Sequence, residues 1–196
     1  MAIRAELVGA VFTRAGEALR QAAAVLDVGC GTGWWLARLA AELDQTVALH
    51  GIELLQERAQ AAAARSPNAT IVSGDACVLP YADHSFDVVT AFTVLSSLRD
   101  ADCIAQALRE ARRVLAADGL LLIWEPRVPN PFNPATRLIN LRAVRAALPD
   151  MTVDHRSITL FPPLARHLAG ATDRLYPLLT QFAPLRTHRL ICARQR

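Results

Sequence analysis

The stretch Val25–Gly33 has the sequence VLDVGCGTG and decides the fold predicted for this chain. It places glycines at positions 29, 31 and 33 after an apolar run that ends in Asp27. The apolar run predicts a buried parallel strand, and the following residues, WWLARLAAEL, predict a helix. A glycine-rich turn between a strand and a helix lets a ligand approach bare backbone at the positive end of the helix.

A second acidic position narrows the choice of ligand. Glu53 lies twenty residues past Gly33, at the end of the apolar run TVALHGIE, where a carboxylate can accept hydrogen bonds from both hydroxyls of a ribose. The dinucleotide fingerprint G-x-G-x-x-G needs a small last residue, but counting from Gly29 that position is Trp34. The pattern therefore predicts a nucleoside-containing cofactor and argues against a dinucleotide.

The composition is that of a globular protein, with 53% apolar and 20% charged residues among 196. No stretch reaches the roughly 18 to 20 uninterrupted apolar residues that a membrane helix needs. Glu6, Arg14 and Glu17 interrupt the apolar pattern of the N-terminal region, which argues against a signal peptide. We therefore expect a cytoplasmic protein of one domain, or of one domain with a short appendage.

The cysteines and histidines predict no metal site. The four cysteines form no C-x-x-C pair, and the five histidines share no i, i+3 or i, i+4 spacing. Cys30 lies within the glycine loop, where a small side chain suffices for packing. The sequence thus indicates neither a disulfide framework nor a bound metal.

The net charge of +3 conceals an asymmetry along the chain. Residues 1–126 hold 10 arginines and 15 acidic residues (net −5), whereas residues 127–196 hold 11 arginines and 3 acidic residues (net +8). The chain contains no lysine, so part of this bias can reflect codon usage. A solvated basic surface explains the pattern; a face toward an anionic substrate, partner or membrane surface is the sharper alternative.

The order of expected elements alternates strands and helices at intervals of about thirty residues or fewer, the rhythm of a doubly wound parallel sheet. A proline-rich loop, PRVPNPFNP, interrupts this order after Glu125. We expect helices at 3–19, from 34 to about 43, ending at 65, from about 101 to 115, and at about 141–148. The expected strands are 25–28, 46–53, 69–73, 86–92, 119–125, 152–160 and 186–196.

Four motifs together resemble the class I S-adenosylmethionine-dependent methyltransferases, in the branch of the ubiquinone and menaquinone biosynthesis enzymes and many small-molecule methyltransferases. They are VLDVGCGTG, GIE, GDACVLPYADHSFDVV and ALREARRVLAADGLLLI, within residues 24–126. The resemblance implies an α/β fold: a Rossmann-like, doubly wound, mostly parallel sheet with an antiparallel last strand in an α/β/α sandwich. It implies one methyltransferase domain over 1–196, with an N-terminal helix (1–23), a cofactor-binding core (24–126) and a substrate side (127–196).

The resemblance also implies S-adenosyl-L-methionine as cofactor and a role for each matching position. The glycine loop would line the methionine portion, Asp27 would hold its ammonium directly or through water, and Glu53 would take the ribose hydroxyls. The cofactor-binding residues expected at the methionine portion and the ribose are Asp27, Gly29, Gly31, Gly33 and Glu53. Those expected at the adenine are Leu54, Asp75 and Ala76, and those near the sulfonium are Phe92 and Thr93. Asp75 has an alternative role, because Asp in a G-D turn often caps its own backbone.

The chain departs from its relatives after the fourth strand. Many relatives place a histidine or an acidic residue there, whereas this chain has VLSSL with Ser96 and Ser97. Glu125, at the end of the fifth strand, is the candidate catalytic base, with His155 and His188 as weaker candidates; pairing with an arginine is the alternative role of Glu125. Only about 24 residues precede the glycine loop, so a substrate lid must be small or come from the C-terminal part or another subunit, as in a homodimer.

These observations predict a methyltransferase that acts on a small molecule, with oxygen favoured over nitrogen and carbon as the acceptor atom. The basic C-terminal third favours an anionic or amphipathic acceptor. The apolar stretch around residues 160–168 indicates helix packing, and a lining for the acceptor is the alternative. One alternative is a non-catalytic S-adenosylmethionine-binding subunit that regulates a partner enzyme. A second, an RNA methyltransferase, rests only on the arginines, because PNPFNP follows the fifth strand rather than the fourth.

Overall fold

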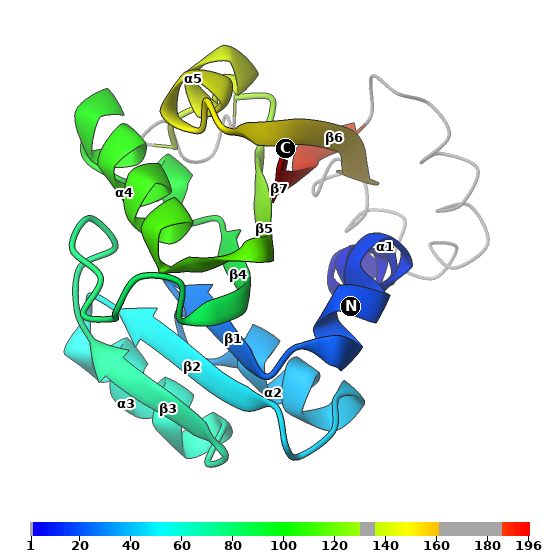
Figure 1. Cartoon of the computed structure of the whole chain (residues 1–196), viewed down its shortest axis with the longest axis vertical. Coiled ribbons are helices and arrows are strands. Elements are labelled where there is room, and N and C mark those ends of the chain that lie inside the picture. Colours follow the sequence, from blue (N-terminus) through cyan, green and yellow to red (C-terminus); the bar gives the residue numbers. More distant parts are fainter. Residues whose placement is uncertain (1, 130–135, 161–185) are drawn as a thin grey trace.

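A seven-stranded sheet forms the centre of the computed structural model, which describes residues 2–129, 136–160 and 186–196 (Figure 1). Its strand order is β3-β2-β1-β4-β5-β7-β6. β7 is antiparallel to both neighbours, and all other pairs are parallel. The strands are β1 (Ala24–Val28), β2 (Ala48–Glu53), β3 (Ala69–Ser73), β4 (Phe86–Phe92), β5 (Leu115–Pro126), β6 (Met151–Leu160) and β7 (Arg186–Gln195).

Helices cover both faces of this sheet, and each face has its own apolar cluster. Along β1, Val25 packs with the helices of one face and Leu26 with those of the other, because successive side chains of a strand point to opposite faces. The first face carries α1 (Ala2–Gln21), α2 (Trp34–Glu42) and α3 (Gln56–Arg65), and the second carries α4 (Ala101–Val114) and α5 (Leu141–Ala147). The predicted Rossmann-like fold class is therefore confirmed.

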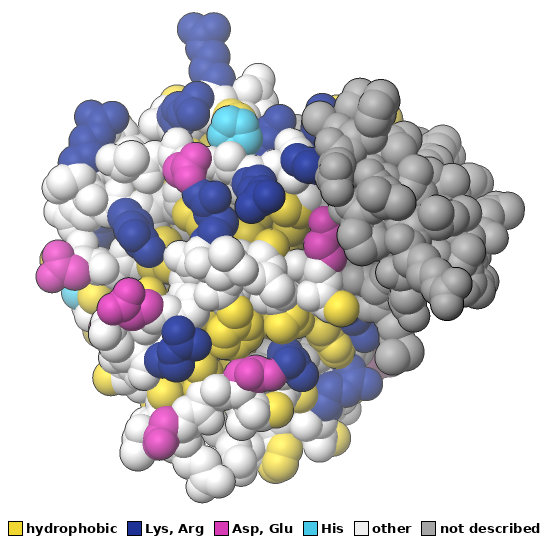
Figure 2. Space-filling view, turned by 90° about the vertical axis from the view of Figure 1, so that its right-hand side faces the viewer, with side chains coloured by type: hydrophobic (Ala, Val, Ile, Leu, Met, Phe, Trp, Pro, Cys, Tyr) yellow, Lys and Arg dark blue, Asp and Glu magenta, His cyan; other side chains and the backbone are white. Residues whose placement is uncertain are grey.

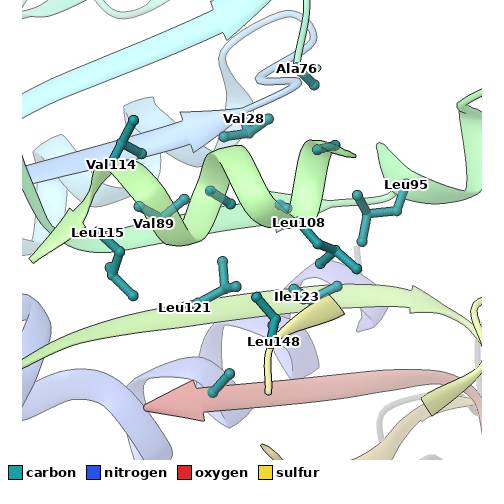
Figure 3. Packing of buried hydrophobic residues seen from close by; sticks show 14 of the residues in the cluster. Val28, Ala76, Val89, Leu95, Leu108, Val114, Leu115, Leu121, Ile123 and Leu148 are labelled. Atoms are coloured by element: carbon teal, nitrogen blue, oxygen red, sulfur yellow. The ribbon is translucent and has the colours of Figure 1, made fainter. Parts of the chain in front are cut away.

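α4 illustrates how the sequence produces this packing. Its buried residues Ala107, Leu108, Ala111 and Val114 recur at helical spacing and form one apolar stripe. Figure 3 shows Leu108 in the same cluster as Leu121 and Ile123 of β5. Burial of a side chain such as Leu108 contributes about 1.5–3 kcal/mol. The apolar stripe therefore holds α4 against the sheet.

Asp100 is the N-cap of α4. A carboxylate oxygen of Asp100 accepts a hydrogen bond from the backbone N–H of Cys103 at 2.8 Å. This bond, followed by the bond from Arg99, lowers the pKa of Asp100 to about 2. The cap satisfies one of the amides that the first turn of a helix leaves without a partner.

One predicted boundary is wrong. The fifth strand is expected to begin at residue 119, at the local turn signal Asp118-Gly119, but β5 already begins at Leu115. Leu115 pairs with Phe86, and Leu120 then pairs with Val88, so the intervening residues form an irregularity in the ladder. Pairing across the sheet thus extends the strand through a local turn signal.

Parts of the C-terminal prediction lie outside the described residues, namely 130–135 of the proline-rich loop and 161–168 of the candidate acceptor lining.

On the face that Figure 2 shows, arginine side chains lie around a central group of hydrophobic side chains. Part of the basic charge is therefore on a solvent-facing surface. In the described ranges no helix is long and apolar enough to cross a membrane.

Candidate functional site

A cavity of about 340 Å³ lies at the carboxyl ends of β1, β2 and β4. Its volume falls within the roughly 300–1,000 Å³ typical of small-molecule sites, and its position is the usual one for ligands of open α/β sheets. The structure brings together eight of the predicted site residues in its lining: Gly29, Gly31, Glu53, Leu54, Asp75, Ala76, Phe92 and Thr93. It places Asp27, Gly33 and Glu125 outside that lining.

The glycine loop joins β1 to α2 with three residues in the left-handed region, at φ values of 67°, 56° and 74° for Gly29, Gly31 and Gly33. A Cβ at Gly29 would lie 2.4 Å from Val94, and one at Gly33 would lie 2.9 Å from the Cα of Ala62. The absence of a Cβ at Gly29 and Gly33 therefore permits the loop to pack closely against Val94 and Ala62. A Cβ at Gly31 would meet nothing within 4 Å, so this residue presents bare backbone to open space.

Glu53 connects the end of β2 to this loop. Its side chain is buried, with the residue 7% exposed. One carboxylate oxygen accepts the N–H of Gly31 at 3.0 Å, and the other accepts the N–H of Leu55 at 3.1 Å. A carboxylate has about four acceptor positions, so Glu53 can accept two further hydrogen bonds from a ligand while it fixes the loop.

Asp27 lies at the base of the loop and is 3% exposed. Its carboxylate accepts a hydrogen bond from the hydroxyl of Thr90 on the neighbouring strand at 2.7 Å. Burial raises the pKa of Asp27 to about 7, the Thr90 bond opposes this shift, and the nearby charge of Glu53 adds to it. Asp27 thus takes up a proton near neutral pH, and a cation nearby would favour its charged form.

The wall formed after β2 and β3 combines apolar and polar groups. Leu54 is 65% exposed and lines the cavity, an unusual exposure for a leucine that touches a concave surface. Asp75 also lines the cavity, and one of its oxygens accepts the N–H of Cys77 at 2.8 Å. The structure therefore contains the local turn that was the alternative role of Asp75, in a residue that also reaches the cavity.

The wall after β4 is held in an uncommon conformation. Thr93 has a φ of 58°, which is rare for a β-branched residue, and its N–H donates to the carbonyl of Trp124 at 2.8 Å. The short helix η1 (Leu95–Ser97) follows at once, and Ser97 lines the cavity. Such local strain persists only where the surroundings determine it, and it is frequent at functional sites.

Glu125 is the support of this wall. It is 1% exposed, and its two oxygens accept the N–H groups of Leu95 at 2.7 Å and Ser96 at 3.3 Å. Burial raises the pKa of Glu125 to about 7, partly offset by its hydrogen bonds with Ser96 and neighbouring amides. Because this carboxyl binds η1 and lies outside the cavity lining, the geometry does not favour the predicted catalytic role, which stays a prediction.

Neither histidine offered as a base lines the cavity. His188 stacks on Trp124 with ring centroids 4.4 Å apart, and burial lowers its pKa to about 4. Within the described ranges, no group of three His, Cys, Asp or Glu residues is placed to hold a metal.

Sequence reasoning missed several lining residues, including Arg58, Val94, Ser97 and Leu98. Arg58 lies in the first turn of α3, five residues after Glu53, and no motif marks it. Ser97 lies in the VLSSL stretch, and its hydroxyl is not a base, so the sequence pattern did not mark it as a site residue.

Residues 25–119 match the protein family described as methyltransferase domain. They form a methyltransferase domain of the class I type. Over 114 residues the chain is 34% identical to demethylmenaquinone methyltransferase of Staphylococcus aureus, which agrees with the predicted menaquinone-type branch. That match covers 57% of this chain and 46% of the relative, so the chain spans about half the length of the curated relatives it matches.

Solved structures agree on the fold of the methyltransferase domain. The structure of the cyclase SpnF superposes with a TM-score of 0.70 at 25% identity, over 96% of this chain and 80% of that one. An S-adenosylmethionine-dependent methyltransferase of Mesorhizobium loti superposes with a TM-score of 0.65 at 17% identity, over 96% of this chain and all (100%) of that one. The family match supports S-adenosylmethionine, the cofactor that the motifs predict.

Proposed function

We propose that this protein binds S-adenosylmethionine in the cavity and transfers its methyl group to a small-molecule acceptor. The observation that carries the proposal is the buried Glu53 carboxylate, which fixes the open backbone of Gly31 and retains free acceptor positions. When bound, the cofactor supplies an activated methyl group on a sulfonium. The chain supplies binding and orientation, which can lower a barrier by roughly 7–11 kcal/mol in favourable cases.

The described residues fit this cofactor from one end to the other. The glycine loop and the buried Asp27 beneath it would hold the methionine end, since a carboxylate suits an ammonium and bare amides suit a carboxylate. Glu53 would bind the ribose. Leu54 would cover the adenine, with Asp75 and Ala76 at its polar edge, and Phe92 and Thr93 would lie near the sulfonium.

Oxygen is the favoured acceptor atom in this proposal. The polar side chains that line the cavity after β4 are the hydroxyls of Thr93 and Ser97, and neither is a base at neutral pH. A phenol or enol hydroxyl needs less help with ionisation than an alcohol or an amide nitrogen. An acceptor of that type would require from these residues mainly positioning.

A binding protein without methyl transfer is the second candidate. It is favoured by the same absence of a base among the described lining residues after β4, and by the fold shared with a protein described as a cyclase. In that case the protein would hold the cofactor and regulate a partner.

The formation of S-adenosylhomocysteine distinguishes the two candidates. The protein is incubated with labelled S-adenosylmethionine and a panel of phenols, enols, amines and bulk RNA, with cell extract as a further acceptor source. Product that depends on a small acceptor supports the proposal. Cofactor binding without product from any source supports the binding protein, and product only with RNA supports an RNA methyltransferase.

A further inference from the structure

Arg189 of β7 is a half-buried cation for which the described part of the chain provides no carboxylate partner. Its Nε is buried and has no hydrogen-bond partner there, and one terminal N–H group donates weakly to the carbonyl of Ile139 at 3.5 Å. Arg112 and Arg113, by contrast, both form ion pairs. An unneutralised charge in a partly buried place costs free energy that a ligand can recover.

A second guanidinium strengthens the positive field around Arg189. Burial and then the charge of Arg127 lower the pKa of Arg189. Arg127 also donates to the hydroxyl of Ser157 at 3.3 Å. After burial, the charges of Arg189 and Arg145 contribute to lowering the pKa of His155, which reports the same positive field on β6.

The carboxylate opposite Arg189 in the sheet binds backbone amides and not the guanidinium. Glu125 is the residue opposite Arg189 in the β5–β7 register, and both project to the face that carries α4 and α5. The oxygens of Glu125 accept the amides of η1 and form no ion pair with Arg189. Glu125 therefore does not neutralise the charge of Arg189, although the two residues lie opposite each other in the sheet.

A short series of contacts connects Arg189 to the wall of the cavity that follows β4. β7 is separated from β4 by β5 alone, which is two strand spacings or about 10 Å. The carbonyl that Arg189 contacts belongs to Ile139, and Arg137, two residues earlier, donates its N–H to the carbonyl of Ser96 at 3.0 Å. Ser97, the next residue, lines the cavity.

We propose that Arg189, assisted by Arg127, binds a carboxylate or phosphate group of the methyl acceptor, with β7 two strand spacings (about 10 Å) from β4. This inference rests on the proposed function, because it assigns the substrate class of the same site. A planar guanidinium with a free Nε–H suits both anions, since each can accept two parallel hydrogen bonds from it.

The test is a titration of inorganic phosphate and, separately, of benzoate into the full chain at low ionic strength, with and without S-adenosylhomocysteine, followed by NMR or calorimetry. We expect at least one anion to bind, and Arg189→Gln to weaken its affinity at least tenfold. The anion that binds identifies phosphate or carboxylate as the recognised group. Arg194→Gln is the matched control, because it removes the same charge from an exposed position of the same strand and should change the affinity less than twofold.

Equal affinities of wild type and Arg189→Gln, absence of binding of both anions, or an equal loss in Arg194→Gln would overturn the inference. If Arg189→Gln lacks the cooperative melting of wild type, Arg127→Gln replaces it and should weaken the same anion at least threefold. Failure of the proposed function has a separate signature, namely no S-adenosylhomocysteine formed from S-adenosylmethionine with any acceptor, while the anion titration without cofactor still tests Arg189.

Discussion

Replacing Glu125 by glutamine should change how the stability of this protein depends on pH. In the wild type the buried carboxyl has a pKa raised from 4.5 to about 7, mainly by burial. An acid whose folded pKa is raised stabilises the fold fully below its unfolded pKa, and this contribution is lost as the pH rises through the folded value. The relevant window is therefore pH 4.5 to about 7.

The size of the effect follows from that shift. A shift of one pKa unit corresponds to about 1.4 kcal/mol, so the interval from 4.5 to about 7 corresponds to about 3 kcal/mol. Glutamine does not titrate, so the stability of Glu125→Gln should lack this pH-dependent contribution. Relative to wild type, Glu125→Gln should therefore gain about 3 kcal/mol between pH 4.5 and 8, a relative rise of about 6–12 °C in Tm for a chain of this length.

The assay is denaturant unfolding of wild type and Glu125→Gln across this pH range, with the difference between their free energies of unfolding plotted against pH. The difference removes the contribution of Asp27, which titrates near the same pH in both proteins. Asp118→Asn is the control, because Asp118 is an exposed residue of the same strand. If the difference in free energy of unfolding between wild type and Glu125→Gln stays constant within about 0.5 kcal/mol across this pH range, the pKa of Glu125 is not raised by burial.

Two further substitutions test the walls of the cavity. Gly29→Ala should cost about 3 kcal/mol of unfolding free energy, because its Cβ would lie 2.4 Å from Val94 at a φ of 67°. The control Gly9→Ala should be neutral or stabilising, since it lies within a helix with nothing within 4 Å, and equal losses in the two variants would contradict the packing argument. Leu54→Ala should raise the Kd for S-adenosylmethionine about fivefold (about 1 kcal/mol) with an unchanged Tm, as the side chain is 65% exposed until a ligand covers it. Val78→Ala, at a 71% exposed residue outside the cavity lining, should not change the Kd, and the same loss in both would argue against the adenine position.

The sequence was sufficient for the parts of the site that depend on neighbouring residues. The glycine loop directly follows β1 and Glu53 is the last residue of β2, so strand order alone brings them to one edge of the sheet. The direction of the Glu125 side chain could not be predicted, because it depends on amides about thirty residues earlier in the chain. The start of β5 was mispredicted for a similar reason, since pairing of Leu115 with Phe86 overrides the local signal of Asp118-Gly119.

Calorimetric titration of S-adenosylmethionine into wild type, Glu53→Gln and Glu57→Gln tests most directly whether Glu53 binds the cofactor in this cavity. Glu57 is an exposed residue of α3, so its substitution removes the same charge near the site without touching the loop. We predict that Glu53→Gln raises the Kd at least tenfold, a loss of at least about 1.4 kcal/mol, and that Glu57→Gln leaves it unchanged. Equal affinities of wild type and Glu53→Gln would contradict the assignment of this cavity as the cofactor site.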